Sequence, residues 1–352
     1  MGISRITGKH LEWYKRTVLR AHRANILRRT APEIRLGSPS FMGFQDFAML
    51  KCFLRFCRQQ KIEFDFFCLN VYHFTSPLNK DYPACLTAYE KTFPYLEGDQ
   101  MLNRSARHMA EALLAEAFTQ PVVVTEWGIS LYTKDLSRDT TFMAAWITEH
   151  LLHLSSKITE ICYCRLTDSM SYGDSSGYEF TGGQGLLTRN GIPKPSFSVL
   201  EMLGLLGAEV WASGDRYLLT HDDSFWCLLI YNYSYYSKDY LTGKQELLFD
   251  EDRYNIYENT LSNYFQIEIK LVPGRYHLET IQIDREHCAP YDEWIKIGKP
   301  AQISPLYQKY IMGRCCPGLQ VETVVTSGRL QIHRVVPVHG ITMVRIQKLA
   351  GP

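Results

Sequence analysis

The sequence predicts a parallel α/β layer followed by an all-β sandwich. Residues 1–207 alternate between helical and strand patterns, which is typical of a parallel α/β layer. Residues 208–352 contain short strand patterns separated by turn residues, with no long helix between them, which is typical of a sandwich. Hydrophobic residues make up 45% of the 352 positions and charged residues 21%. This composition indicates a folded protein with a sizeable core.

Amphipathic patterns predict five helices in the first part, because apolar residues recur there every three or four positions. Asp46 and Asp139 are expected N-caps, and so is Asn103. The first helix is basic, and a solvated outer face explains its charge better than a nucleic-acid contact. The helices are expected over residues 9–29, from Asp46 through Cys57, over 103–118, from Asp139 through Leu154, and over 195–206.

Four apolar runs lie between these helices, and buried parallel strands have this composition because both of their faces are covered. The runs cover residues 34–37, 64–72, 122–127 and 161–166. In parallel α/β barrels, functional side chains lie where strands end. The strand ends therefore supply the candidate site residues, which are Ser38, Asn70, Tyr72, Glu126, Thr167 and Asp168.

Seven strands are expected in the second part, and several alternate apolar with polar residues, as at Phe265, Ile267 and Ile269. Such alternation buries one face of a strand. The expected strands cover residues 216–220, 225–233, 264–271, 275–283, 319–326, 329–335 and 340–347.

Charge and cysteine spacing exclude several classes of protein. The formal net charge is +1, so no overall field favours a nucleic-acid or membrane partner. No apolar stretch approaches the ~20 residues that span a bilayer, and the N-terminus has no signal pattern. The ten cysteines form no CxxC pair and no zinc-like cluster with histidine. Buried free thiols in a reducing compartment are expected, so we predict a cytoplasmic protein.

Glu126 is the candidate with the most chemical meaning. It directly follows Val-Val-Val-Thr and directly precedes Trp127-Gly128. A carboxylate at that point would project into a barrel mouth beside an aromatic wall, where it could attack the anomeric carbon of a sugar. A salt bridge at a strand end would explain an isolated glutamate equally well.

Several short motifs follow one another in a characteristic order along the chain. They are Leu36-Gly-Ser-Pro39, Asp65-Phe-Phe-Cys-Leu-Asn-Val-Tyr72, Thr125-Glu126-Trp127, Tyr163-Cys-Arg-Leu-Thr-Asp168, Gly182-Gly-Gln-Gly-Leu-Leu187, Gly191-Ile-Pro-Lys-Pro195, Leu229-Ile-Tyr-Asn-Tyr233 and Tyr291-Asp-Glu-Trp294. Their order resembles glycoside hydrolase family 39, the β-xylosidase and α-iduronidase family, and the resemblance covers nearly the whole chain. The motifs most resemble the version of this domain attached to AraC-type transcription regulators in Gram-positive bacteria.

This resemblance implies a retaining, β-xylosidase-like glycosidase that acts on O-glycosidic bonds, with Glu126 as nucleophile. Tyr72 would hydrogen-bond the nucleophile, Trp127 would wall the pocket, and Asn70 would contact substrate. Asp168 is the fourth expected binding residue, although bracing a strand end is its more usual role. The implied substrate is a xyloside or related oligosaccharide. No metal or organic cofactor is implied, because two carboxyls suffice for this chemistry.

The sequence also departs from the family pattern. The Asn-Glu pair that carries the family's general acid is not found, and the matching motifs begin mid-barrel. We therefore expect a partial (β/α)8 TIM-type barrel, about strands 5–8, over residues 1–207, with a β-sandwich accessory domain over 208–352. Another chain would supply the other half-barrel, or the chain is a fragment. Asn70 replaces a histidine, Cys164 replaces a tryptophan, and Ser171 or Tyr172 replaces a glutamate.

Three interpretations stay open at this point. The chain is a glycosidase with little activity by itself, or a non-catalytic carbohydrate-sensing domain associated with an AraC-type regulator. The third interpretation is a truncated product with no independent function. The altered positions favour the second, and the retained Thr125-Glu126-Trp127 favours the first.

Overall fold

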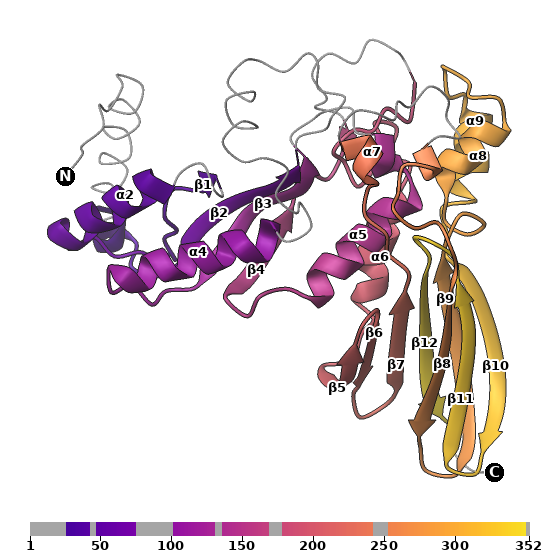
Figure 1. The fold of residues 1–352 in the computed structure, drawn as a ribbon. Coiled ribbons are helices and arrows are strands. Elements are labelled where there is room, and N and C mark those ends of the chain that lie inside the picture. The colour runs from indigo at the N-terminus through magenta and orange to yellow at the C-terminus, as the bar shows by residue number, and fades with distance from the viewer. Residues whose placement is uncertain are drawn as a thin grey trace. The chain divides into compact units, whose positions relative to one another are not determined.

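A computed structural model describes residues 26–42, 47–74, 101–130, 136–168, 178–241 and 253–349. The chain divides into two compact units, and Figure 1 shows their elements. The first unit comprises residues 1–74, 96–131 and 154–164, and the second comprises 75–95, 132–153 and 165–352. Residues 165–207 thus group with the C-terminal strands. The domain boundary between a barrel part and a sandwich part after residue 207 stays a prediction. Within the described ranges, no helix is long and apolar enough to cross a bilayer.

The first unit contains a four-stranded parallel sheet in the order β1-β2-β3-β4 (Figure 1). Helices separate its strands along the chain, as the alternating sequence pattern predicts. The elements are β1 (Phe41–Met42), α2 (Phe47–Gln60), β2 (Phe67–Phe74), α4 (Met101–Ala115), β3 (Val122–Ser130) and β4 (Ile158–Tyr163).

The core of the first unit lies between this sheet and its helices. Alternate residues of β2 point to opposite faces, and Phe67 packs edge-on against Phe64 and Phe118 on the helical side. Leu69 and Val71 are buried on that same face. The intervening residues of β2, including the half-buried Asn70 and Tyr72, therefore point to the face away from the helices.

All four strand predictions of the first part need correction. β2 begins three residues later and ends two residues later than predicted, and β3 ends three residues later, so Tyr72 and Glu126 lie within their strands and not at their ends. The expected strand at residues 34–37 is irregular apart from a bridge between Gly37 and Phe66, and regular pairing resumes only in β1. Pro39 has no N–H to donate, which interrupts the ladder between them. The strand expected at 161–166 is instead β4, three residues earlier, because Arg165 leaves the sheet and its N–H donates to the Gln184 carbonyl.

The expected caps also differ from the structure. Thr140 is the N-cap of α5 (Thr141–Leu152), whereas Asp139 ends a 3-10 helix, η3 (Leu136–Asp139). Asp139 does not cap because its carboxylate pairs with Lys194. Asn103 lies inside α4, where its Oδ1 accepts a hydrogen bond from the Ser155 N–H. The predicted helix at 9–29 is described only from residue 26, where it is helical, and Asp46 lies outside the described residues.

The second unit carries a six-stranded antiparallel sheet, β10-β9-β12-β7-β6-β5, and a two-stranded sheet, β11-β8. Seven of its strands match the predicted ones to within two residues, whereas β5 and the short helices α7–α9 were not predicted. The elements are α6 (Pro195–Leu203), β5 (Glu209–Gly214), β6 (Tyr217–His221), β7 (Trp226–Tyr231), α7 (Lys238–Leu241), β8 (Asn263–Lys270), β9 (Gly274–Ile283), α8 (Pro290–Lys296), α9 (Pro305–Met312), β10 (Gly318–Thr326), β11 (Arg329–Val336) and β12 (Ile341–Lys348).

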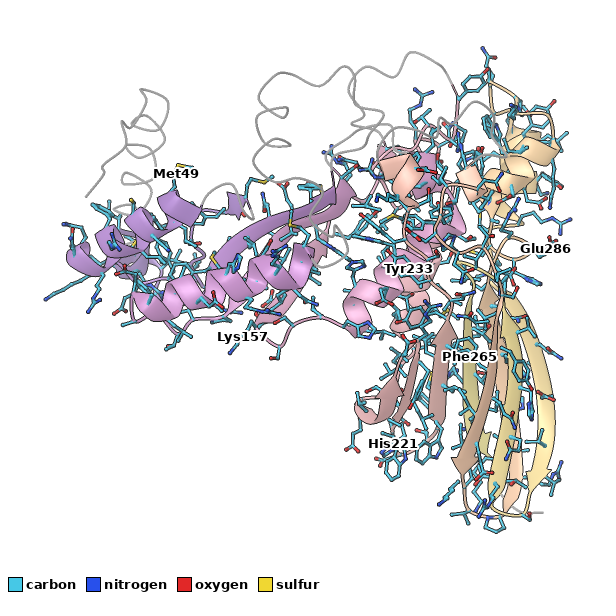
Figure 2. The ribbon with its side chains drawn as sticks, in the orientation of Figure 1. Met49, Lys157, His221, Tyr233, Phe265 and Glu286 are labelled. Atoms are coloured by element: carbon cyan, nitrogen blue, oxygen red, sulfur yellow. The ribbon has the colours of Figure 1, made fainter. Side chains whose placement is uncertain are left out.

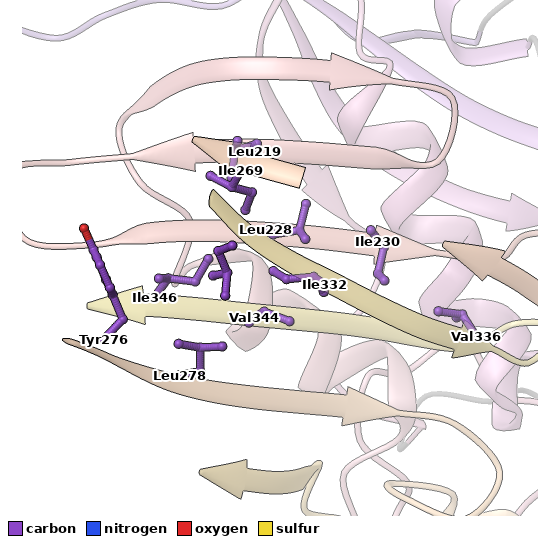
Figure 3. Packing of buried hydrophobic residues seen from close by; sticks show 11 residues of the cluster. Leu219, Leu228, Ile230, Ile269, Tyr276, Leu278, Ile332, Val336, Val344 and Ile346 are labelled. Carbon is purple, nitrogen blue, oxygen red and sulfur yellow. The ribbon is translucent and has the colours of Figure 1, made fainter. Parts of the chain in front are cut away.

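The two sheets of the second unit enclose one hydrophobic cluster (Figure 3). Leu228 and Ile230 of β7 and Val344 of β12 come from the larger sheet, and Ile332 of β11 comes from the smaller one. Alternation along each strand supplies these apolar faces. Tyr233, labelled in Figure 2 just beyond β7, stacks on Phe142 of α5, which joins this region to the helix within the same unit.

Candidate active site

Strand β3 places Glu126 at an irregularity in the sheet. Leu69 pairs with Val124, but the next residue of β2, Asn70, pairs with Glu126, so β3 contains one extra residue at Thr125. Such a bulge bends a strand and re-aims its side chains. Here it leaves the Glu126 side chain exposed while Val122 to Val124 stay buried. The carboxylate is thus presented at the surface of the first unit from an otherwise buried strand.

Tyr72 holds this carboxylate. Its hydroxyl donates a hydrogen bond to Glu126 Oε2 at 2.9 Å. The Tyr72 ring lies over Gly128, where an added Cβ would come within 3.2 Å of the ring. Burial raises the pKa of Tyr72, and the neighbouring Cys164 and Glu126 raise it further. The phenol therefore stays protonated and serves only as a donor to the carboxylate.

A small polar network lies beside this pair. Asn70 Oδ1 accepts hydrogen bonds from Ser40 Oγ at 2.6 Å and from Thr125 Oγ1 at 2.8 Å. Among the described residues, no partner is bonded to the Asn70 Nδ2 group, which leaves two N–H donors for a ligand. Ser40 and Thr125 are thus positioning residues for Asn70.

Trp127 lies in the interior of the first unit. Its side chain is 1% exposed and packs edge-on against Tyr163, with ring centroids 6.0 Å apart. Consecutive strand residues point to opposite faces, so the exposed Glu126 places Trp127 on the buried one. The expectation that Trp127 forms a pocket wall does not fit this burial, because no face of the ring is open to a sugar.

Asp168 belongs to the second unit and binds a buried lysine. Its Oδ2 lies 2.8 Å from Lys194 Nζ, and its Oδ1 accepts the Gly185 N–H at 2.6 Å. Burial raises the pKa of Asp168, and the charge of Asp139 adds to this, although the Lys194 ammonium opposes both. These bonds make Asp168 a brace for the loop that carries Gly183 and Gly185, although β4 ends five residues earlier, at Tyr163.

Lys194 is the centre of this ion cluster. It is fully buried, and its Nζ also lies 2.9 Å from Asp139 Oδ1 and donates to the Gly183 carbonyl. Although burial acts to lower it, Asp139 and Asp168 hold the pKa of Lys194 above its usual value. The ammonium therefore stays charged and joins three segments of the second unit.

Of the predicted nucleophile Glu126 and the four predicted binding residues, all but Asp168 lie in the first unit, and the structure joins Tyr72 directly to Glu126. Ser171 and Tyr172 fall outside the described residues. Ser40, Thr125 and Lys194 were not predicted as functional residues. Lys194 stands in the conspicuous Gly-Ile-Pro-Lys-Pro run, but no local pattern marks it as the partner of two distant aspartates.

Comparison with known proteins gives one family. Residues 6–308 match the model of glycosyl hydrolases family 39. The β-xylosidase of Caldicellulosiruptor saccharolyticus is 24% identical over 196 residues, 54% of this chain and 37% of that protein. The β-xylosidase of Geobacillus stearothermophilus is 23% identical over 233 residues, 64% of this chain and 44% of that protein. The chain thus spans less than half the length of these curated relatives.

A solved structure shows a similar fold. The family 39 enzyme from Xanthomonas axonopodis pv. citri superposes with a TM-score of 0.76 at 19% identity, covering 95% of this chain and 64% of that one. Identity this low establishes shared architecture and leaves the chemistry to be argued from the site itself.

Proposed function

The chain belongs to glycoside hydrolase family 39, with the family's TIM-barrel and β-sandwich type of fold, and we propose that it is a retaining, β-xylosidase-like glycosidase domain with Glu126 as nucleophile. One observation carries the proposal. Glu126 is an exposed carboxylate at a bulge in β3, and the protonated Tyr72 hydroxyl holds its Oε2 at 2.9 Å.

This geometry suits nucleophilic attack. With Oε2 engaged by Tyr72, Oε1 of Glu126 would attack the anomeric carbon as the bond to the leaving oxygen breaks, which gives a covalent glycosyl-enzyme. The Tyr72 bond fixes the rotamer of the carboxylate, so the attacking oxygen is oriented before substrate arrives. The free Asn70 N–H donors would bind a sugar hydroxyl beside it.

A retaining glycosidase needs a second carboxyl about 5–5.5 Å from the first, to protonate the leaving oxygen and then activate water. In the described part of the chain, Tyr72 is the hydrogen-bond partner of Glu126 and no carboxyl contacts it. We propose that the general acid comes from outside the described residues or from another chain that supplies further barrel strands. Until that group is in place, turnover would be weak.

The proposed substrate is a xyloside or a related oligosaccharide, in keeping with the two β-xylosidases among the relatives. The site offers one carboxylate and neutral hydrogen-bonding groups, which suits an uncharged sugar. No nucleic-acid or membrane partner is proposed, and the cytoplasmic location stays a prediction. The nine described cysteines are free, five of them buried, which is compatible with a reducing compartment.

A 2-fluoro-xyloside inactivator tests the proposal, because it traps the glycosyl-enzyme on the nucleophile. Peptide mass mapping of the full chain should find the label on Glu126, and Glu126→Gln should abolish it. The matched control is Glu160→Gln, an exposed β4 carboxylate that pairs with Arg35, and it should label like the natural protein. A folded sample without label on Glu126, or with the label elsewhere, refutes the assignment.

A second function is a carbohydrate-sensing domain without turnover, associated with an AraC-type regulator. The observation in its favour is that Asn70 replaces the family's histidine and is held by Ser40 and Thr125 as a binding group. Calorimetry would then give binding heat for xylose or xylobiose, while no reducing sugar is released from xylobiose over a long incubation. Release of xylose that Glu126→Gln abolishes would exclude this function.

A further inference from the structure

Three aromatic rings gather at one end of the six-stranded sheet of the second unit. Trp211 of β5 lies 5.4 Å from the His221 ring and 5.1 Å from the Trp226 ring, measured between centroids. His221, which is labelled in Figure 2, lies at the end of β6. Its ring centroid lies 4.9 Å from that of Trp226, with the two planes 31° apart. Strand β6 pairs with both β5 and β7, so the three rings come from neighbouring strands and form one cluster.

A bulge in β5 presents the Trp211 ring of this cluster to solvent. Val210 pairs with Thr220 but Ala212 pairs with Leu219, so Trp211 is the extra residue of β5. Ala212 and Trp226 are partly buried against the core between the two sheets, whereas the Trp211 side chain stays outside it with 64% of its surface exposed. Bulges in edge strands re-aim single side chains, and this one turns a large apolar ring outward.

The exposed ring is held in place. Trp211 meets Trp226 at an interplanar angle of 84° and His221 at 77°, which is the favoured edge-to-face arrangement of aromatic rings. Trp226 is in turn anchored by its contact with the core. The Trp211 ring therefore has a fixed orientation. The protein then loses little side-chain conformational entropy when a ligand stacks on this ring.

Polar and acidic groups border the rings. His221 Nε2 lies 3.2 Å from Glu209 Oε2, and the Glu209 side chain is 74% exposed. The hairpin between His221 and Trp226 adds Asp222 and the exposed Asp223. Such a border disfavours anionic ligands, including nucleic acid. It offers acceptors for hydroxyl groups beside an apolar face, and a neutral pyranose has this combination of hydroxyls and a C–H face.

We propose that Trp211, His221 and Trp226, together with Glu209, form a carbohydrate-binding site for a neutral oligosaccharide, made of residues other than those of the candidate active site. A sugar ring would stack on Trp211, and Glu209 would accept hydrogen bonds from its hydroxyls. Binding here requires no bond cleavage, so the site does not depend on Glu126 acting as a nucleophile.

NMR titration of the full chain with xylohexaose, and separately with cellohexaose, tests this site. The indole N–H signal of Trp211, identified by its loss in Trp211→Ala, should shift on addition of oligosaccharide. Calorimetry should show binding about ten-fold weaker in Trp211→Ala and nearly unchanged in Trp211→Phe, which keeps a stacking ring. Val325→Ala removes an exposed apolar side chain of β10 in the same sheet, and should bind like the natural protein.

Both titrations are run in the Glu126→Gln background, which prevents hydrolysis and separates this proposal from the proposed function. Failure of the inactivator to label Glu126 in the natural protein would leave the Trp211 shift unaffected. The carbohydrate site is refuted if neither oligosaccharide moves the Trp211 signal, or if Trp211→Ala binds both as tightly as Trp211→Phe. If Trp211→Ala fails to fold, Trp211→Phe identifies the indole signal instead, because it also lacks the indole N–H, and the titration of the Glu126→Gln protein with Trp211 intact still decides the matter.

Discussion

Replacing Lys194 by methionine should destabilise the second unit strongly. Methionine has a similar length, so the change removes the charge with little change in volume. The Lys194 ammonium pairs with Asp139 at 2.9 Å and Asp168 at 2.8 Å, and all three side chains are buried. Removing one member of a buried ion pair typically costs about 3–5 kcal/mol, because the remaining charge has lost its compensation.

The expected loss for Lys194→Met is therefore about 4 kcal/mol of unfolding free energy at pH 7. Arg253 Nη1, 3.8 Å from Asp139 Oδ2, offsets part of the loss on the Asp139 side. On the Asp168 side, Oδ1 still accepts the Gly185 N–H but the charge of Lys194 is gone, so restoring neutrality there should recover stability. The double variant Lys194→Met, Asp168→Asn should consequently lose less free energy of unfolding than the sum of the losses in the two single variants.

Urea denaturation followed by circular dichroism measures these values, with a fit that allows the two units to unfold separately. Lys296→Met is the matched control, because Lys296 pairs with Glu293 at the surface, where a pair contributes about 0–1 kcal/mol. A loss below about 1 kcal/mol for Lys194→Met, or strict additivity with Asp168→Asn, would refute the account of the cluster.

Three further predictions follow from buried or restrained groups. Tyr72→Phe should slow labelling of Glu126 by a 2-fluoro-xyloside about ten-fold while leaving the melting temperature nearly unchanged, and equal labelling rates would contradict the positioning role. Burial lowers the pKa of His339 to about 4 from 6.5, so the unfolded state binds more protons than the folded state between these pH values. The free energy of unfolding should therefore fall by about 3 kcal/mol as the pH drops from 6.5 through 4. A His339→Phe variant measured by urea denaturation should lack this loss. Burial raises the pKa of Cys315 to about 12, so a thiol reagent at pH 8 should modify the exposed Cys316 rapidly and Cys315 only on unfolding, as peptide mapping would show.

Local sequence patterns determined much of the framework. A continuous apolar run predicted that β3 begins at Val122, because a strand buried on both faces needs such a run. The strand continues past Glu126 to Ser130, so Glu126 lies within β3 and not at its end as predicted. The position of Tyr72 two residues after Asn70 put both on one face of β2, since side chains alternate along a strand. Alternation in Phe265 to Leu271 likewise predicted β8 to within one residue.

Contacts between distant segments decided the rest. The bulge at Thr125 depends on how β3 pairs with β2, and this register leaves Glu126 exposed while Trp127 is buried. Asp139 gave the local signal of an N-cap, yet its carboxylate pairs with Lys194, which lies 55 positions along the chain. Patterns within one segment carry periodicity and turn chemistry, but the partner of a buried charge and the register between strands exist only when the chain is folded. The sequence therefore determined which residues could form the site, and the tertiary structure decided which of them meet.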